Sequence, residues 1–545
     1  MKITNLRWIL VLPIFFSLSS CLNDLEITTK DDDQSLSEQF FANNPDSYKQ
    51  FLAKIYAGYV VTGQKGPAGD PNSNDPDLGS SVDEGFSQYM RGYWQCQELT
   101  TDEAIIAWGE SDNKTIKDLN FNTWDKDNIF TEAFFARVFF QIGLCNEFLR
   151  ETTEAKLNGR GTSEDLRNQI VKFRAEVRFL RALTYYHGID IFGNVPFMTD
   201  SDVLGSKPPM QSREFVFNYI IGELDAIDGD LAAPKANEYG RADKAAAWML
   251  KAKLLLNAKV YTGKDRSPEA LVAINKVLNS GYTVIANRSR LFQADNNTNG
   301  AQNEIIFPLC SDGTKSQTWG GMTYLVHAGC GNSKSSTPTL AAELGIDDGW
   351  GGYRVRKEFV ESVGTDDARV TYVPGNTDPA SIIDVTVSSN TLAFNQGKKL
   401  TKFTNIRSDG AKASSKTFPD TDFPLFRMGD AYLMYAELAA NGFGDKTTAK
   451  NYINELRTRA NPTAQTITES EVTPDLVLNE RAKELYWEGH RRQDLIRFGK
   501  YLTGYNWEWK GGVQSGVSLP EYRLLFAIPT NELRANSNLS QNPGF

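Results

Sequence analysis

The chain has 545 residues, of which 23% are charged and 40% are hydrophobic, proportions that are ordinary for a globular protein. Its net charge of −10, with no basic cluster along the chain, argues against a nucleic-acid-binding surface. Length alone favours about two to four domains or one large helical body with insertions.

The first apolar run of the chain is WILVLPIFFSLSSC, which ends at Cys21 and follows the basic residues Lys2 and Arg7. It is shorter than the roughly 20 apolar residues that a membrane-spanning helix needs, and its layout is typical of a secretory signal peptide. Leu-Ser-Ser-Cys at its end resembles a bacterial lipobox. We therefore expect a signal peptide over residues 1–20, lipidation of Cys21, a tether over 21–40 and one folded body over 41–545. An ordinary signal peptide with a chance cysteine is the alternative.

Helical periodicity dominates several later blocks. In residues 173–187, Phe173, Val177, Leu180 and His187 fall on one helical stripe, and residues 241–258 repeat the pattern. A further helix is expected from Ser267, with Ser267 as the N-cap and Pro268 in the first turn.

Three more helices are expected towards the C-terminus. The first is expected in PLFRMGDAYLMYAELAANG, the second before Pro462, and the third in LVLNERAKELYWEGHRR. Paired helices with small residues on the packing face, at spacings near 34 residues, are typical of tetratricopeptide repeats. The predicted fold is mainly α, a tetratricopeptide-like scaffold with irregular loop insertions near 62–115 and 284–424. A generic helical bundle is the alternative.

Few signatures of catalysis are present. There is no P-loop, GxSxG or HExxH motif, and the three histidines are His187, His327 and His490. Carboxylates are plentiful, so a lipid-anchored glycoside hydrolase stays open as an alternative. The other four cysteines are widely spaced and form no CxxC pair, which makes a zinc site unlikely and leaves any disulfide pairing open: Cys96, Cys145, Cys310 and Cys330.

One pair of carboxylates is a candidate metal site. Asp420 and Asp422 stand two residues apart in FPDTDFP, between prolines. Hard carboxylate ligands of this kind can share one Ca²⁺. The alternative is a surface turn whose aspartates cap a helix that begins near Leu425.

The strongest candidates for ligand binding are aromatic. Trp319 stands in TWGG and Trp350 in DDGWGGY, and each is followed by two glycines that would leave the indole face uncovered. A sugar ring can stack its C–H face on such an indole while nearby polar groups bond its hydroxyls. Trp108, followed by Glu110 and Ser111, is a third candidate platform. Core packing is the alternative for each tryptophan.

Six segments carry a resemblance to a known family: VTGQKG (61–66), GRADKAAAW (240–248), WGGMTYLV (319–326), FPDTDFPLFR (418–427), EGHRRQDLIRFG (488–499) and SQNPGF (540–545). Over nearly the whole mature chain, the sequence resembles the SusD/RagB family of outer-membrane lipoproteins. The resemblance implies a non-catalytic, lipid-anchored protein on the cell surface, with a glycan site built from inserted loops. It also implies that the protein forms a lid on a SusC-like TonB-dependent transporter.

The first and third of these segments favour the branch of the family that binds starch and maltooligosaccharides. Two alternatives stay open: another glycan, such as a β-glucan or fructan, on the same scaffold, and a repeat scaffold that binds only protein.

The resemblance further implies roles for single residues. The glycan site would comprise Asp83, Arg91, Trp108, Ser111, Trp319 and Trp350. Ile106 stands where the family's starch-binding archetype has a tryptophan, so we expect a smaller stacking surface and weaker binding than a full aromatic arc gives. A structural Ca²⁺ would be held by Asn297, Asp420 and Asp422, with the neutral amide of Asn297 a weaker ligand than a carboxylate.

Overall fold

The computed structural model describes residues 38–42, 44–63, 77–78, 83–106, 108, 115–330, 338–372 and 398–545. The chain divides into two compact units, residues 1–47 and residues 48–545. In the first unit the described part is helical over residues 38–42. The predicted signal peptide and Cys21 lie outside the described residues, and so does most of the predicted tether.

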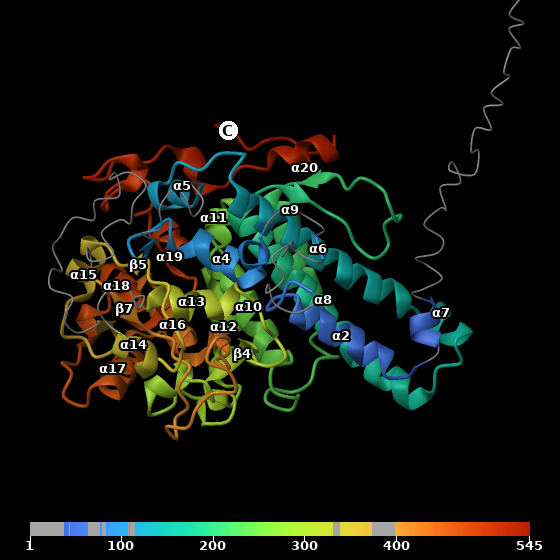
Figure 1. The fold of residues 1–545 in the computed structure, drawn as a ribbon, viewed down its shortest axis with the longest axis horizontal. Coiled ribbons are helices and arrows are strands. Elements are labelled where there is room, and N and C mark those ends of the chain that lie inside the picture. Colours follow the sequence, from blue (N-terminus) through green and yellow to red (C-terminus); the bar gives the residue numbers. More distant parts are fainter. Residues whose placement is uncertain are drawn as a thin grey trace, which may run out of the picture. The chain divides into compact units, whose positions relative to one another are not determined.

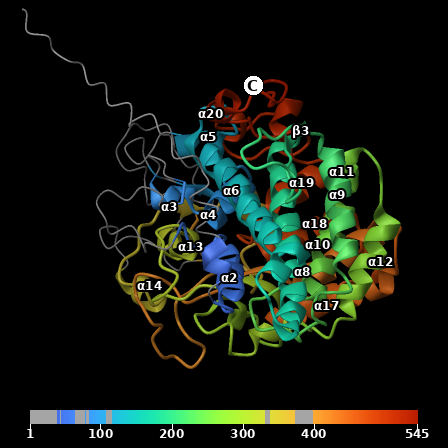
Figure 2. The same cartoon turned by 90° about the vertical axis from the view of Figure 1, so that its right-hand side faces the viewer.

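The second unit is built mainly from helices, and most of them pack on helices that are close to them in chain order. In chain order, the main ones are α6 (Ile129–Glu151), α8 (Glu164–Phe192), α9 (Arg213–Ala226), α10 (Lys244–Leu256), α12 (Ser267–Leu278), α16 (Met428–Ala440), α17 (Lys446–Ala460) and α18 (Pro474–Leu485). α8 packs on α6 and α9, α12 on α10 and α16, and α16 on α17 and α18. Figures 1 and 2 show α6 and α8 side by side as the longest rods. This array confirms the mainly α prediction.

The predicted helical stripes lie in the core. Phe173, Val177, Leu180 and His187 of α8 are all buried. Side chains at the helix starts accept the N–H groups that have no partner within the helix; they belong to Asn128, Ser163, Asp243, Asp445 and Thr473. α12 differs from expectation by one residue, because Ser267 is its first helical residue rather than its N-cap.

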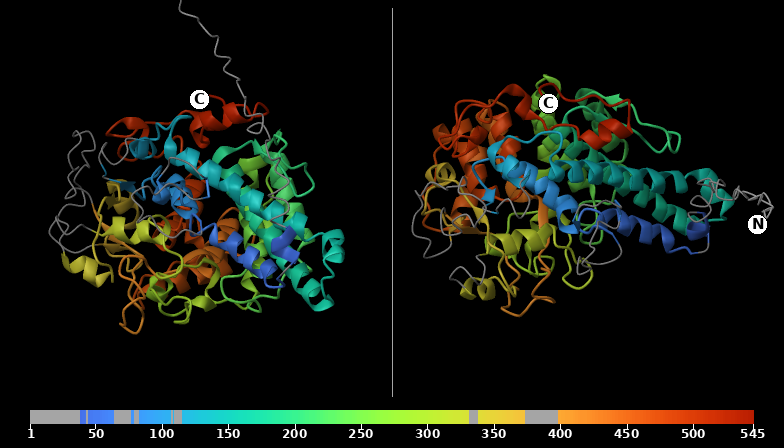
Figure 3. Two further views of the ribbon diagram at one scale, coloured as in Figure 1. Left: turned by 45° about the vertical axis from the view of Figure 1, so that its right-hand side comes forward. Right: turned by 45° about the horizontal axis from the view of Figure 1, so that its top comes forward.

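Shorter elements connect and cover these helices. The helices are α2 (Ser47–Ala57), α3 (Glu84–Ser87), α4 (Tyr89–Glu98), α5 (Thr115–Phe121), α7 (Glu154–Gly159), α11 (Ala258–Thr262), α13 (Gly321–Gly329), α14 (Pro338–Glu343), α15 (Lys357–Val363), α19 (Arg491–Arg497) and α20 (Thr530–Ala535). The strands form antiparallel pairs: β1 (Ile105–Ile106) with β5 (Tyr353–Arg354), β2 (Val195–Pro196) with β3 (Met210–Gln211), β4 (Ile305–Leu309) with β8 (Phe423–Arg427), and β6 (Thr371–Tyr372) with β7 (Leu400–Thr401). In Figure 3, α14 and α15 (yellow) lie towards the end of the second unit opposite α7 (teal).

Two expected helices differ from prediction. The helix expected from Leu425 begins at Met428, because FPLFR forms strand β8, which is buried throughout and pairs with β4. The aspartate at 422 therefore precedes a strand and does not cap a helix. The helix expected through YWEGHRR ends at Leu485, and α19 begins at Arg491, so His490 is an N-cap and not a mid-helix residue.

The break between α18 and α19 is held by buried contacts. Trp487 has a φ of +60°, which is uncommon for a residue other than glycine. The Trp94 indole N–H donates to the Trp487 carbonyl oxygen at 2.9 Å, and the Trp487 indole N–H donates to the Glu103 carbonyl oxygen at 2.9 Å. A Glu98 carboxylate oxygen accepts the backbone N–H of Gly489 at 2.7 Å. Tertiary contacts therefore override the local helical pattern.

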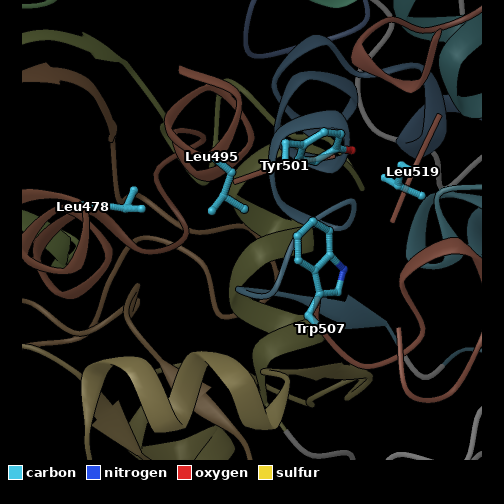
Figure 4. Close-up of a cluster of buried hydrophobic side chains, with 5 residues drawn as sticks. All are labelled: Leu478, Leu495, Tyr501, Trp507 and Leu519. Atoms are coloured by element: carbon cyan, nitrogen blue, oxygen red, sulfur yellow. The ribbon is translucent and has the colours of Figure 1, made fainter. Parts of the chain in front are cut away.

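The C-terminal segment completes the core beyond α19. A cluster of buried side chains joins this segment to α18 and α19 (Figure 4), and it comprises Leu478, Leu495, Tyr501, Trp507 and Leu519. Nearby, the Arg491 guanidinium donates to both carboxylate oxygens of Asp102, at 2.8 and 2.7 Å. Among the described residues, none of the helices has both the length and the apolar character that crossing a bilayer requires.

Candidate functional site

Two of the predicted tryptophans come together in space although 31 positions separate them. The ring centroids of Trp319 and Trp350 are 6.0 Å apart, and their planes are inclined by 50°. Both side chains are half-buried. The Trp319 ring also lies 5.0 Å from the ring of Phe418. The arrangement leaves two neighbouring indoles at a fixed tilt, each with part of its surface accessible.

The position of Trp319 depends on a buried carboxylate. Glu84, the first residue of α3, is 1% exposed and accepts the backbone N–H of Trp319 at 3.0 Å. It also accepts the hydroxyls of Thr62 and Thr318, the first at 2.7 Å. A single ionisable group thus ties the start of α13 to α3 and to the end of the α2 segment.

The glycines that follow the two tryptophans allow the backbone to pack closely against neighbouring segments, in addition to leaving the indoles uncovered. A β-carbon at Gly320 would stand 2.3 Å from Cβ of Gln88, so only glycine fits against the start of α4. A β-carbon at Gly352, where φ is +116°, would stand 2.5 Å from the indole nitrogen of Trp108. The glycines that suggested an uncovered indole therefore also allow the loops to approach α4 and Trp108.

Trp108 lies next to this pair through the backbone of the Trp350 loop. Its indole N–H donates to the Gly351 carbonyl oxygen at 3.0 Å, and its ring meets that of Tyr324 edge-on at 5.8 Å. Trp108 is half-buried.

By contrast, Ile106 is 0% exposed and pairs with Tyr353 in the β1–β5 ladder. Ile106 therefore offers no exposed face for stacking, and the expectation of weaker binding than a full aromatic arc gives stays a prediction.

The predicted polar residues differ in their surroundings. Asp83 is exposed and precedes α3. Arg91 is only 2% exposed, its guanidinium lies 3.8 Å from the centroid of the Tyr324 ring, and it donates to the Gly85 carbonyl oxygen at 3.1 Å. Its Nε and Nη2 atoms have no hydrogen-bond partner among the described residues. Arg91 thus packs on the Tyr324 ring, which in turn contacts the ring of Trp108. Ser111 lies outside the described residues.

The predicted calcium ligands are already hydrogen-bonded. Asp420 accepts the backbone N–H groups of Gly313 at 2.7 Å and Ser414 at 2.6 Å. Asp422 accepts the Ser311 N–H at 2.7 Å and the Tyr239 hydroxyl at 2.9 Å, and burial, together with the charge of Asp420, raises its pKa to about 7.

The third predicted ligand, Asn297, is exposed. Within the described ranges no group of three His, Cys, Asp or Glu side chains is arranged to hold a metal ion. As they stand, these residues do not form a closed set of calcium ligands, and the calcium site stays a prediction.

The sequence did not identify three residues that build the site. Glu84 holds Trp319, Phe418 packs on it, and His327 packs under Trp350 with ring centroids 4.9 Å apart. Phe418 stands in the FPDTDFP segment that drew attention only for its carboxylates. No sequence signal separates Glu84 from other acids, because its role depends on contacts across more than 200 residues.

The sequence is similar to proteins of one known family. The family model described as "SusD family" matches residues 349–545. The chain is 35% identical to the starch-binding protein SusD of Bacteroides thetaiotaomicron over 98% of both sequences, and 26% identical to SusD-like protein P25 of Formosa agariphila over 68% of this chain and 72% of that protein.

Among solved structures, the surface glycan-binding protein A from Bacteroides thetaiotaomicron, in complex with laminarihexaose, superposes with a TM-score of 0.65 at 20% identity, over 91% of this chain and 99% of that one. A SusD superfamily protein from Parabacteroides distasonis superposes with a TM-score of 0.67 at 22% identity, over 92% and 99%. These two structures support the fold alone. The 35% identity over almost the full length establishes that the chain belongs to the SusD family.

Proposed function

We propose that this protein is a non-catalytic lipoprotein of the cell surface that binds a glycan through Trp319 and Trp350. The observation that carries the proposal is the pair of half-buried indoles, 6.0 Å apart and inclined by 50°. Two indoles in this arrangement can stack on successive sugar rings, where apolar burial and ring electrostatics both contribute. Polar groups nearby, with Asp83 the most exposed, would bond the hydroxyls.

The favoured ligand is an α-glucan such as starch or a maltooligosaccharide. The relative with 35% identity is named a starch-binding protein. Two inclined stacking planes also suit a chain whose successive rings turn, as those of α-glucans do. A β-glucan is the second candidate, because a structure that superposes on this fold holds laminarihexaose.

The proposal extends to location and partner. Cys21 at the end of the apolar leader would carry the lipid anchor in the outer membrane, and the folded unit would present the glycan to a SusC-like TonB-dependent transporter. Cys21→Ser should abolish incorporation of labelled fatty acid into the protein, because only the thiol of Cys21 can carry the lipid, whereas a Ser20→Ala control should keep the label. Labelling that persists in Cys21→Ser would contradict the anchor.

Calorimetry on the mature protein, lacking residues 1–21, tests the ligand. The titrants are maltoheptaose, a cyclodextrin, laminarin and levan. Binding of the first two, lost in Trp350→Ala, is the expected result. Binding of laminarin or levan alone would keep the glycan-binding function and replace the substrate, and no binding to any of the four would contradict the proposal.

Two further measurements separate the remaining alternatives. Family membership supports a non-catalytic protein, so no reducing sugar should be released from starch; turnover that one carboxylate variant abolishes would favour a hydrolase. A scaffold that binds only protein would show the same sugar binding before and after replacement of both Trp319 and Trp350 by alanine.

A further inference from the structure

His327 is a buried side chain at the point where the segments carrying the two tryptophans meet. It belongs to α13, whose start follows Trp319, and it is 1% exposed. Its backbone carbonyl oxygen accepts the N–H groups of Trp350 at 2.8 Å and Gly351 at 3.2 Å. Its ring lies under the indole of Trp350, with the centroids 4.9 Å apart and the planes inclined by 31°. Both the main chain and the side chain of His327 thus contact the Trp350 loop.

The two ring nitrogens of His327 reach different segments. Nδ1 lies 2.5 Å from the carbonyl oxygen of Asp348, in the Trp350 loop, and Nε2 lies 2.9 Å from the carbonyl oxygen of Thr417. Thr417 precedes Phe418, whose ring packs on Trp319 at 5.0 Å. One imidazole therefore links the loop of Trp350 to the segment that packs on Trp319.

We propose that His327 is a positioning residue that fixes the tilt between the indoles of Trp319 and Trp350 and thereby sets glycan affinity. This inference rests on the proposed function and adds to it a residue that does not touch the ligand. The same two segments share a second connection, since the Thr417 hydroxyl donates to Asp347 at 2.5 Å and the Asp347 N–H donates to the Lys416 carbonyl oxygen at 3.2 Å. His327 is the connection that also contacts a tryptophan ring.

Protonation changes how many of these contacts His327 can make. Both ring partners are carbonyl oxygens, which only accept hydrogen bonds, and a neutral imidazole has a single N–H. The imidazolium form donates to both carbonyls, whereas the neutral form leaves one nitrogen lone pair facing a carbonyl oxygen. The tilt between the indoles is therefore held by two hydrogen bonds in the charged form and by one in the neutral form.

The charged groups around His327 act in both directions. Burial lowers the pKa of His327 below its ordinary value of 6.5, while the carbonyl oxygens of Asp348 and Thr417 and the carboxylates of Asp347 and Asp348 oppose that shift. Lys416 is the cation of the neighbouring segment, and Tyr324 and Cys330 are the titratable neighbours on α13 and at its end. The neutral form therefore prevails at neutral pH, and acidification restores the second hydrogen bond.

The test compares His327→Leu and His327→Gln with His490→Gln. Leucine removes both side-chain contacts, and glutamine keeps a donor for one carbonyl. His490 is a matched control, since it is also buried. Its ring approaches Lys253 and Asp430, and these contacts involve neither the Trp350 loop nor the segment at Thr417. Its pKa is lowered to about 3 by burial and by Lys253, so it does not titrate in the range tested.

Two readouts keep the inference separate from the proposed function. The first needs no ligand: indoles 6.0 Å apart couple in circular dichroism, and the coupled signal, assigned by its loss in Trp319→Phe, reports their tilt. The second is calorimetric affinity for maltoheptaose, or for whichever titrant binds, between about pH 5 and pH 7.5.

We expect the coupled signal to weaken in His327→Leu and to persist in His490→Gln. Affinity should fall about fivefold to tenfold in His327→Leu and less in His327→Gln, which is the effect of one or two hydrogen bonds. Wild-type affinity should rise as the pH falls towards the lowered pKa of His327, and both His327 variants should lack that rise. An unchanged coupled signal, or a pH profile that His327→Gln retains, would overturn the inference. If no glycan binds, the proposed function fails and the coupled signal alone decides. If His327→Leu does not fold, His327→Gln carries both readouts.

Discussion

Replacing Glu84 by alanine should release the segment that carries Trp319. Glu84 is the shared acceptor for the Trp319 N–H at 3.0 Å and for the hydroxyls of Thr62 and Thr318. Alanine removes all three hydrogen bonds in a buried region and leaves an amide N–H without an acceptor. The hydroxyls can rotate towards other acceptors, but the N–H cannot.

The size of the effect follows from the buried donor. An unsatisfied buried donor costs about 1–3 kcal/mol, and hydrogen bonds to a charged acceptor are worth about 1.5–3 kcal/mol. Allowing for the rotating hydroxyls, we expect local opening of residues 318–321 to become easier by about 2–4 kcal/mol. That free energy corresponds to amide exchange that is roughly 30-fold to 1,000-fold faster.

Hydrogen exchange followed by mass spectrometry measures this directly on peptides that cover residues 318–321. The matched control is Glu84→Gln, in which the amide oxygen can accept the Trp319 N–H while the amide N–H groups donate to the two hydroxyls. Glutamine should therefore keep most of the protection from exchange. Glycan affinity should fall more in the alanine variant than in the glutamine variant. Unchanged exchange in Glu84→Ala would refute the role of Glu84 in holding Trp319.

Three further predictions concern the same region and the core behind it. Trp319→Ala and Trp350→Ala should each weaken glycan binding at least tenfold by calorimetry, because each removes one stacking face; equal affinity in either variant would contradict the site. Gly352→Ala should lower thermal stability by about 1–3 kcal/mol, because φ is +116° and the new β-carbon would stand 2.5 Å from the Trp108 indole nitrogen; an unchanged melting temperature would count against that packing. Burial raises the pKa of Glu98 from 4.5 to about 7. The folded state therefore binds a proton that the unfolded state releases, stability falls by roughly 3 kcal/mol as pH rises from about 4.5 to 7, and Glu98→Gln should flatten that part of the profile in denaturant unfolding.

Much of the scaffold was predictable because its helices carry long apolar stripes. The stripe over residues 173–187 lies in α8, the helical pattern over 241–258 contains α10 (Lys244–Leu256), and the helix expected before Pro462 is α17 (Lys446–Ala460). The strand at 423–427 was not predictable from periodicity, since a run of five buried residues fits a strand or a helix equally well. The break at Trp487 was missed because it depends on distant partners such as Glu98 and Glu103.

The candidate site shows the same limit. Trp319 and Trp350 were recognisable from their glycine-rich surroundings, and the structure brings them together. The residues that fix their tilt were not recognisable, because Glu84 and His327 act through contacts with segments up to 235 positions away. A buried acid and a buried histidine have many possible roles in a sequence, and only the fold selects among them.

The family motifs and the ligand site therefore carry different information. The motifs EGHRRQ and QNPGF hold the scaffold: Arg491 pairs with a buried aspartate, and Asn542 donates to the carbonyl oxygens of two core phenylalanines at 2.8 and 2.7 Å. None of these contacts reaches the indoles. A change beneath Trp350 can therefore alter the tilt of the stacking planes while every one of these contacts is kept. Family membership accordingly identifies the fold, and we infer that the angle between Trp319 and Trp350, set by a few buried polar contacts, governs glycan affinity.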